Sequence, residues 1–383
     1  MHPGWLPAPA ATDRLIGGLN SGKWSPNSCY NKQMSLNGYA FFVTKGLEDV
    51  CLDEIEATLN ATRFEAVVRP KLVLTTAQVT SKAIRKLRTV DDAGEVLAEP
   101  GQVNDQRQLS EYIAASLTKE NLEAAALRTR GFDDQFSVTV TAARSPAGNA
   151  SQLQQILEEH ITSLMKWQPL VRERASLDLR LFADQSWVML SRRMFEEPLS
   201  NRSYRLHATP GALRPTVAAA MVRLTGSHAG GYRVWDPFCG SGTILAEAAL
   251  KNNEVAGTDI SAEAIAVARE NLGAVRRELW SSVSVGDSTN NAVWKRHEKC
   301  NVIITNIPWG KQVDIKSARA LYESLAAGCA ELTLKRRGVA AILTTDPERL
   351  KAALRRVTSE IQVVEKKIGL LGQTPTIVTI QAR

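Results

Sequence analysis

Short apolar strands alternate with longer helices throughout the second half of the sequence, and this alternation constrains the fold more than any other feature. It begins with an expected helix over 216–224, and the chain ends with two strands that no helix separates. The expected strands are 232–235, 254–258, 282–285, 300–305, 338–344, 360–368 and 375–381, and the expected helices are 243–252, 261–275, 315–336 and 347–357. This order predicts a doubly wound, Rossmann-like α/β sheet. The last two strands predict an antiparallel edge.

The first half of the sequence has a different layout. Strands and helices over 39–44, 46–59, 71–76 and 81–88 predict a small α+β lobe. An irregular, helix-leaning connector is expected over 90–130. It is followed by a strand, a helix and a hairpin over 136–140, 151–167, 176–182 and 186–191. Residues 1–37 are rich in Pro, Gly, Ser and Asn, and we expect a flexible tail there.

Charge and cysteine content narrow the classes of partner. The net charge is +7, and the excess lies wholly in residues 206–383, with 23 basic against 16 acidic residues, because residues 1–205 carry 24 of each. This balance suits an anionic partner, and it suits an ordinary soluble surface about equally well. The five cysteines include no CxxC pair, so neither a disulfide framework nor a metal site is expected. No apolar run reaches the roughly 18 residues of a membrane span, and no secretory signal opens the chain, so a cytoplasmic location is expected.

A glycine-containing turn follows the first strand of the second half. The run Asp236-Pro-Phe-Cys-Gly-Ser-Gly-Thr243 leads from a strand into a helix. Gly240 and Gly242 let the backbone approach a ligand that a Cβ would repel. The run has no Gly-Lys-Ser/Thr and does not match GxGxxG, so it is neither a phosphate-binding P-loop nor a dinucleotide fingerprint.

Acidic residues end the next two strands. Asp259 lies about 20 residues beyond the glycines, where an acid hydrogen-bonds ribose hydroxyls in nucleotide-binding α/β sheets. As an alternative, Asp259 would cap the following helix, although Ser261 fits that role better. Asp287 ends the next strand and is placed to accept a hydrogen bond from an adenine amino group.

The tetrad Asn306-Ile-Pro-Trp309 follows the fourth strand and indicates methylation of an exocyclic amine. The lone pair of such an amine is delocalised into the ring, so the nitrogen is a poor nucleophile. The Asn306 side-chain oxygen and the Ile307 carbonyl can accept its two N–H groups and turn the lone pair toward a methyl donor. Trp309 can stack on the base, which offsets part of the cost of extruding it.

These motifs resemble those of class I S-adenosylmethionine-dependent methyltransferases over residues 204–383. The stretch Tyr204-Arg-Leu-His-Ala-Thr-Pro-Gly-Ala-Leu-Arg-Pro-Thr216 narrows the resemblance to the THUMP-domain tRNA guanine-N2 methyltransferases. The resemblance covers nearly everything except the expected tail over 1–37. It implies a ferredoxin-like domain over 38–100, an RNA-binding THUMP domain over 101–203 and a methyltransferase domain over 204–383. It further implies that the target is a guanine in the tRNA acceptor stem, at position six in the best-known members. Whether a small activator subunit takes part stays open.

The resemblance also implies a set of site residues. The S-adenosylmethionine site would contain Asp236, Phe238, Gly240, Ser241, Gly242, Asp259, Ile260, Asp287 and Ser288. Asn306, Pro308 and Trp309 would hold the base. The commoner tetrad has Pro at the second position and Tyr or Phe at the fourth, where this chain has Ile307 and Trp309. The candidates for RNA contact are Arg144, Arg192, Arg193, Arg202 and Arg205.

Several other functions fit parts of the pattern. A DNA amino-methyltransferase shares the donor motif, but such enzymes often place the tetrad before it, whereas here the tetrad follows by about 70 residues. A protein-glutamine methyltransferase would leave an RNA-binding half without a role. The remaining alternatives are a 23S ribosomal RNA guanine-N2 methyltransferase and a catalytically inactive RNA-binding scaffold.

Overall fold

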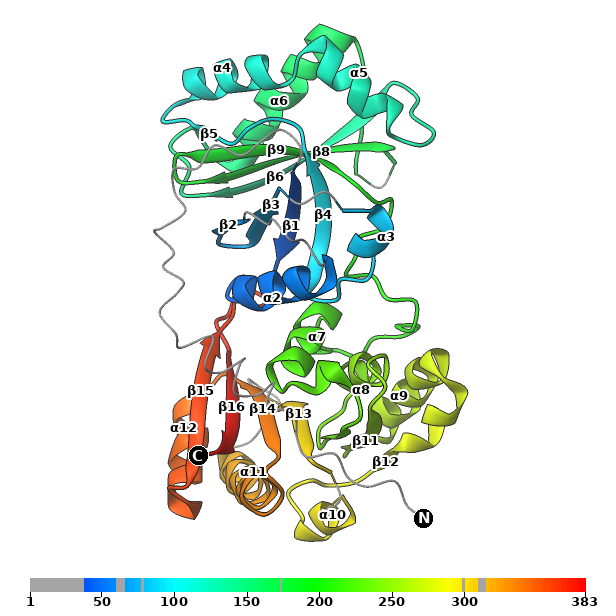
Figure 1. The fold of residues 1–383 in the computed structure, drawn as a ribbon, viewed down its shortest axis with the longest axis vertical. Helices are drawn as coiled ribbons and strands as arrows, with labels where there is room; N and C mark the ends of the chain where they lie inside the picture. The colour runs from blue at the N-terminus through cyan, green and yellow to red at the C-terminus, as the bar shows by residue number, and fades with distance from the viewer. Residues whose placement is uncertain (1–37, 60–65, 77–78, 173, 298–299, 309–314) are drawn as a thin grey trace. The chain divides into compact units, whose positions relative to one another are not determined.

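The computed structural model describes residues 38–59, 66–76, 79–172, 174–297, 300–308 and 315–383 (Figure 1). The expected tail over 1–37 and Trp309 lie outside these residues. The chain forms two compact units. One contains Ser200–Arg383 together with Thr44–Val50, and the other contains Cys51–Leu199 together with the described residues before Thr44.

The unit that contains Ser200–Arg383 is built on a seven-stranded sheet with the order β12-β11-β10-β13-β14-β16-β15. Its strands are β10 (Arg233–Asp236), β11 (Glu254–Asp259), β12 (Val283–Val285), β13 (Val302–Asn306), β14 (Val339–Thr344), β15 (Ile361–Lys367) and β16 (Thr376–Ala382). The first five run parallel, and β16 runs antiparallel to both of its neighbours. The predicted Rossmann-like sheet with an antiparallel carboxy-terminal pair is therefore confirmed.

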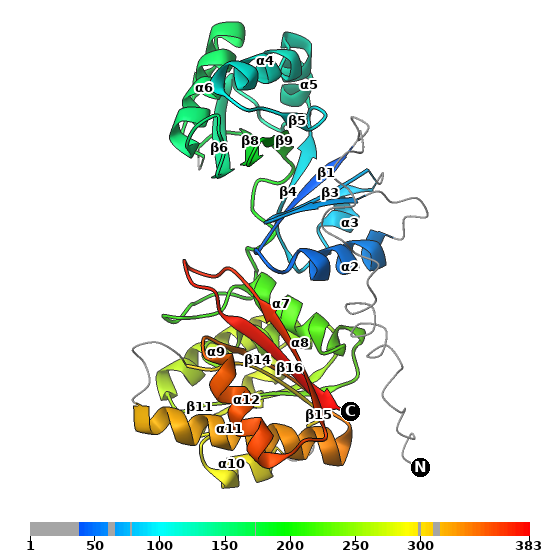
Figure 2. The same ribbon diagram turned by 90° about the vertical axis from the view of Figure 1, so that its left-hand side faces the viewer.

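Helices cover both faces of this sheet (Figure 2). They are α7 (Pro215–Leu224), α8 (Thr243–Ala249), α9 (Ala262–Val275), α10 (Asn291–Arg296), α11 (Ile315–Arg336) and α12 (Pro347–Val357), with two 3₁₀ turns, η1 (Ser227–Ala229) and η2 (Arg277–Ser282). Successive strand residues point to opposite faces. Ile304 therefore joins the core beneath α7 and α8, and Ile303 joins the core beneath α11 and α12.

The second unit has one continuous sheet, with the order β2-β3-β1-β4-β9-β8-β6-β7 and with β5 paired to β9. Its strands are β1 (Tyr39–Val43), β2 (Ala66–Arg69), β3 (Leu72–Thr75), β4 (Val90–Val96), β5 (Gly101–Gln102), β6 (Gln135–Ala143), β7 (Gln168–Pro169), β8 (Leu177–Asp184) and β9 (Trp187–Arg193). Its helices are α2 (Glu48–Leu59) from Cys51 onward, α3 (Ser81–Ile84), α4 (Gln106–Ser116), α5 (Lys119–Leu127) and α6 (Ala150–Met165). The expected division after residue 100 falls within this sheet.

Strand β4 corrects one expectation, because it lies within the segment 90–130, where an irregular connector is expected. Its sequence, VDDAGEV, offers no alternation of apolar and polar residues and places Asp92 in the interior, 4% exposed. The Asp92 carboxylate is compensated by three guanidinium groups: Arg180 at 2.6 Å, Arg193 at 3.0 Å and Arg172 at 3.4 Å. A strand that buries charges through tertiary ion pairs shows no hydrophobic period, so its sequence alone did not reveal it.

We predict that Asp92→Ala lowers the free energy of unfolding by about 3 kcal/mol, because the buried Arg180 and Arg193 lose a shared carboxylate. Among the described residues, only Arg180 of these two keeps a second carboxylate partner, Asp178 at 3.3 Å. The matched control is Glu111→Ala, which removes an ion pair to Arg107 whose side chains are 60% and 74% exposed. Solvent screens that pair, and the control should leave stability nearly unchanged. Urea denaturation followed by circular dichroism measures both. Equal stabilities for the two variants would contradict the role given to Asp92.

Candidate active site

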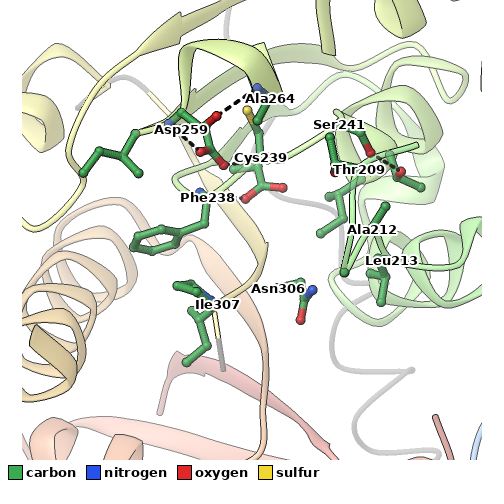
Figure 3. Close-up of a pocket in the computed structure, with 18 of the residues that line it drawn as sticks. Thr209, Ala212, Leu213, Phe238, Cys239, Ser241, Asp259, Ala264, Asn306 and Ile307 are labelled. Atoms are coloured by element: carbon green, nitrogen blue, oxygen red, sulfur yellow. Dashed lines mark hydrogen bonds between the residues drawn. The ribbon is translucent and has the colours of Figure 1, made fainter. Parts of the chain in front are cut away.

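A cleft of about 930 Å³ opens where the parallel strands end. The loops after β10, β11, β12 and β13 line it, together with residues of two further segments, Thr209–Arg214 and 370–373 (Figure 3). The cleft lies at the carboxyl ends of the strands and includes the point between β10 and β13 where the strand order reverses, which is where open α/β sheets bind ligands.

The turn after β10 uses its two glycines differently. Gly240 has φ +49°, lines the cleft, and has open space where a Cβ would lie. Gly242 has φ +78°, but a Cβ there would lie 3.3 Å from the Ala268 side chain on α9. Gly242 does not line the cleft, in contrast to its predicted place in the donor site. A glycine is required at position 242 because φ is positive there and because α9 packs close to the backbone.

The acids after β11 and β12 both line the cleft. The Asp259 carboxylate accepts the N–H of Gly240 at 2.9 Å and of Ser261 at 3.0 Å, and so joins two neighbouring loops. Ser261, rather than Asp259, caps α9, since its hydroxyl accepts the N–H of Ala264 at 3.1 Å. Asp287 is exposed and accepts two hydrogen bonds from Thr289.

The remaining predicted donor-site residues differ in what their side chains do. Phe238 and Ile260 line the cleft, and Ile260 is 73% exposed. Ser241 also lines it but is buried. Ser288 lines the cleft as well, but its hydroxyl is buried and donates to the Pro237 carbonyl at 2.7 Å. The Ser288 side chain therefore holds the loop in place.

Asp236 is buried and connects the two central strands of the site. Its Oδ1 accepts hydrogen bonds from the Thr305 hydroxyl on β13 at 2.7 Å and from the Phe238 N–H at 3.0 Å. Burial raises the pKa of Asp236 to about 7. This carboxyl group sets the relative position of the glycine turn and the end of β13.

Asn306 ends β13 and projects into the cleft, near Ile307 and across from the Ala212–Leu213 wall (Figure 3). Ile307 is fully buried, and its N–H donates to the Leu343 carbonyl at 3.3 Å. A proline at this position, as in the commoner tetrad, could not make that bond. Pro308 also lines the cleft.

The five arginines predicted to face RNA differ in exposure and in their partners. Arg192 pairs with Glu95 at 2.7 Å, Arg193 with Asp92, and Arg202 with the buried Glu247 at 3.0 Å. These three side chains are at most 11% exposed, so they offer little surface to an RNA. Arg205 is partly buried, whereas Arg144 is 73% exposed and lies 3.8 Å from Asp184. Charge alone did not reveal which arginines have buried carboxylate partners.

Sequence reasoning missed one wall of the cleft. Leu370, Leu371 and Gln373 line it, although they lie on the connection between β15 and β16, far along the chain from the four motifs. No local pattern marks this connection as part of a site, because it reaches the cleft only through the antiparallel return of β16. The Thr209–Arg214 wall belongs to the stretch that carried the family resemblance.

Within the described ranges, no group of three His, Cys, Asp or Glu side chains is placed to hold a metal ion. None of the helices that the structure describes is both long and apolar enough to cross a membrane.

The buried Asp236 predicts a pH effect on stability. Its pKa is raised from 3.8 to about 7 in the folded protein, so between these pH values the folded state binds a proton that the unfolded state does not. The stability that the protonated Asp236 contributes is therefore lost as pH rises from about 4 to about 7. Between these two pKa values, the free energy of unfolding of the wild type should fall with pH by at most about 1.4 kcal/mol per pH unit. We expect Asp236→Asn to remove this dependence. Urea titrations of both proteins from pH 4 to 8 measure it. Superimposable pH profiles would contradict a raised pKa.

The family and fold comparisons agree with this geometry. Residues 202–376 match the model of the RMKL-like methyltransferase domain. TrmN from Thermus thermophilus has a similar structure, with a TM-score of 0.72 over 90% of this chain and 99% of that protein, at 22% identity. That likeness supports the shared fold.

Curated relatives share shorter segments of sequence. The Thermus thermophilus tRNA (guanine(6)-N2)-methyltransferase is 31% identical over 191 residues, which are 49% of this chain and 55% of that protein. The Methanothermobacter thermautotrophicus tRNA (guanine(10)-N2)-dimethyltransferase is 38% identical over 104 residues, 26% of this chain and 29% of that protein. The chain thus spans 29% and 55% of the length of these two relatives. Residues 202–376 are therefore similar to the RMKL-like methyltransferase domain, and they have a class I, Rossmann-like fold.

Proposed function

We propose that this protein transfers a methyl group from S-adenosylmethionine to the exocyclic N2 amine of a guanine in tRNA. The observation that carries the proposal is the position of Asn306, which ends β13 and faces the same cleft as Asp259, Asp287 and the turn at Gly240. An amide that accepts hydrogen bonds thereby shares one cavity with the acids expected at a nucleoside site.

The residues on the β10–β12 side fit the methyl donor. The volume of about 930 Å³ lies within the range of about 300–1,000 Å³ for small-molecule sites. A carboxylate has about four lone-pair positions, so Asp259 retains acceptor capacity for ribose hydroxyls beside its two backbone bonds. Asp287 would accept from the adenine amino group, and Phe238 offers an apolar wall. When bound, S-adenosylmethionine supplies an electrophilic methyl group.

The end of β13 fits the acceptor amine. The Asn306 side-chain oxygen and the Ile307 carbonyl would accept the two N–H groups of guanine N2 and orient its lone pair toward the donor end. The buried Ile307 side chain and its N–H bond to Leu343 fix the backbone there. Trp309 is proposed to stack on the base. This chemistry needs no strong base before methyl transfer, so His207 is given no role.

The relatives favour guanine N2 of RNA as the target. Two of them are named as tRNA guanine-N2 methyltransferases, and a third, from Homo sapiens, as the U6 snRNA (guanine-N(2))-methyltransferase THUMPD2. We propose a guanine of the acceptor stem, position six, as the nucleotide and the cytoplasm as the location. Residues 38–100 and 101–203 are proposed as the ferredoxin-like and THUMP domains that hold the RNA.

Ribosomal RNA is a second candidate substrate. The Ribosomal RNA large subunit methyltransferase K/L of Photobacterium profundum aligns with 280 residues, 70% of this chain, at 25% identity, although they make up only 34% of that protein. The alignment extends beyond the methyltransferase domain, and this specific observation keeps ribosomal RNA among the outcomes to be tested.

The substrate assay separates these candidates. Incubation of the protein with labelled donor and unmodified total tRNA, followed by nucleoside analysis, should yield N2-methylguanosine. Label found only in ribosomal RNA or DNA would redirect the assignment. If calorimetry detects no donor binding at all, the chain is a scaffold rather than an enzyme.

Asn306→Ala is expected to bind donor almost normally but to transfer methyl groups slower by orders of magnitude, because the amine loses a positioning acceptor. Calorimetry and single-turnover transfer to tRNA measure the two effects. The control is Asn301→Ala. Asn301 directly precedes β13, at the end of the strand away from Asn306, and its side chain accepts a hydrogen bond from the Arg233 N–H that the variant loses. The control should retain transfer. Undiminished turnover by Asn306→Ala would remove the tetrad from the mechanism.

A further inference from the structure

Leu371 occupies the tip of a tight hairpin at the rim of the cleft. The hairpin joins β15 to β16, the red strands of Figure 1. Leu370 and Gln373 exchange two backbone hydrogen bonds of 3.0 and 2.9 Å, which leaves a two-residue turn. Both turn residues have positive φ, +51° at Leu371 and +76° at Gly372. These angles indicate a type I′ turn.

Leucine is poorly suited to this position on two independent grounds. Type I′ turns favour asparagine or glycine at their first central residue, because other side chains are strained in the left-handed conformation. The Leu371 side chain is also 82% exposed to water. Neither the turn nor the solvent favours an apolar side chain here. Strain of this kind persists mainly where a side chain has a function.

The hairpin holds Leu371 in a fixed place. The preceding Leu370 is 5% exposed and packs in the core with Ile368 and Ile377. Ile368 donates its N–H to the Pro375 carbonyl at 2.9 Å, below the turn. One leucine therefore anchors the tip and the next projects from it. Both line the cleft that contains Asn306.

We propose that Leu371 is a wedge that enters the base stack of a paired RNA segment and occupies the space left by the guanine extruded toward Asn306. The inference rests on the proposed function. Removing a paired base from a duplex costs unstacking and unpairing energy, and inserted apolar side chains such as leucine stabilise the opened step. A wedge fixed by a tight turn loses little conformational freedom on binding.

Leu371→Asn tests the wedge, because asparagine suits the turn but lacks the apolar tip. We expect an unfolding midpoint no lower than that of the wild type and unchanged calorimetric binding of S-adenosylmethionine. Methyl transfer to an unmodified tRNA transcript should fall by about tenfold in kcat/KM. Leu371→Met should retain most of the activity. The matched control is Leu250→Asn. Leu250 is also exposed, but it follows the carboxyl end of α8 and does not line the cleft.

A second RNA distinguishes a wedge from a general structural role. Once the methylated guanine has been mapped, a transcript with an abasic site opposite it needs no base pair to be opened. The defect of Leu371→Asn should shrink toward wild-type activity on this RNA. Full activity of the variant on intact tRNA, or an equal defect on both RNAs, would overturn the wedge. Failure of the wild type to methylate tRNA would instead remove the proposed function, and the wedge with it.

Discussion

The parallel pairing of β10 with β13 is the constraint on which the site depends. The strand order reverses at this pair, so the ends of two strands separated by about 70 residues of sequence lie side by side. The Thr305 hydroxyl bonds the buried Asp236 carboxyl across the pair at 2.7 Å. The glycine turn and Asn306 follow these two residues directly. A change in this register would separate the proposed donor and acceptor halves of the cleft.

Hydrogen bonds between loops prepare the cleft before any ligand is bound. Asp259 joins the loops after β10 and β11, and Ser288 connects the loop after β12 to Pro237. Asn306 therefore stands at the end of a strand whose surroundings are already fixed. Catalysis by positioning requires this kind of rigidity, because the reacting groups gain most when their orientation is set in advance.

Buried ion pairs stabilise the unit that contains Cys51–Leu199. Arg180, Arg193 and Asp92 are nearly inaccessible, so their charges act on the fold of that unit rather than on an anionic partner. The same side chains in an exposed position would have supported an RNA-binding surface. The effect of an arginine thus depends on its burial and its partner, which composition does not report.

The sequence by itself determined the methyltransferase sheet, its antiparallel edge, and the position of Asp236, Asp259, Asp287 and Asn306 at strand ends. It could do so because strand and helix periods are local and because the carboxyl ends of parallel strands share one edge. Only the tertiary structure decided that β4 is a strand, that Gly242 packs against α9, and that Leu371 reaches the cleft. These features arise from contacts between residues far apart in the chain, and such contacts leave no local pattern.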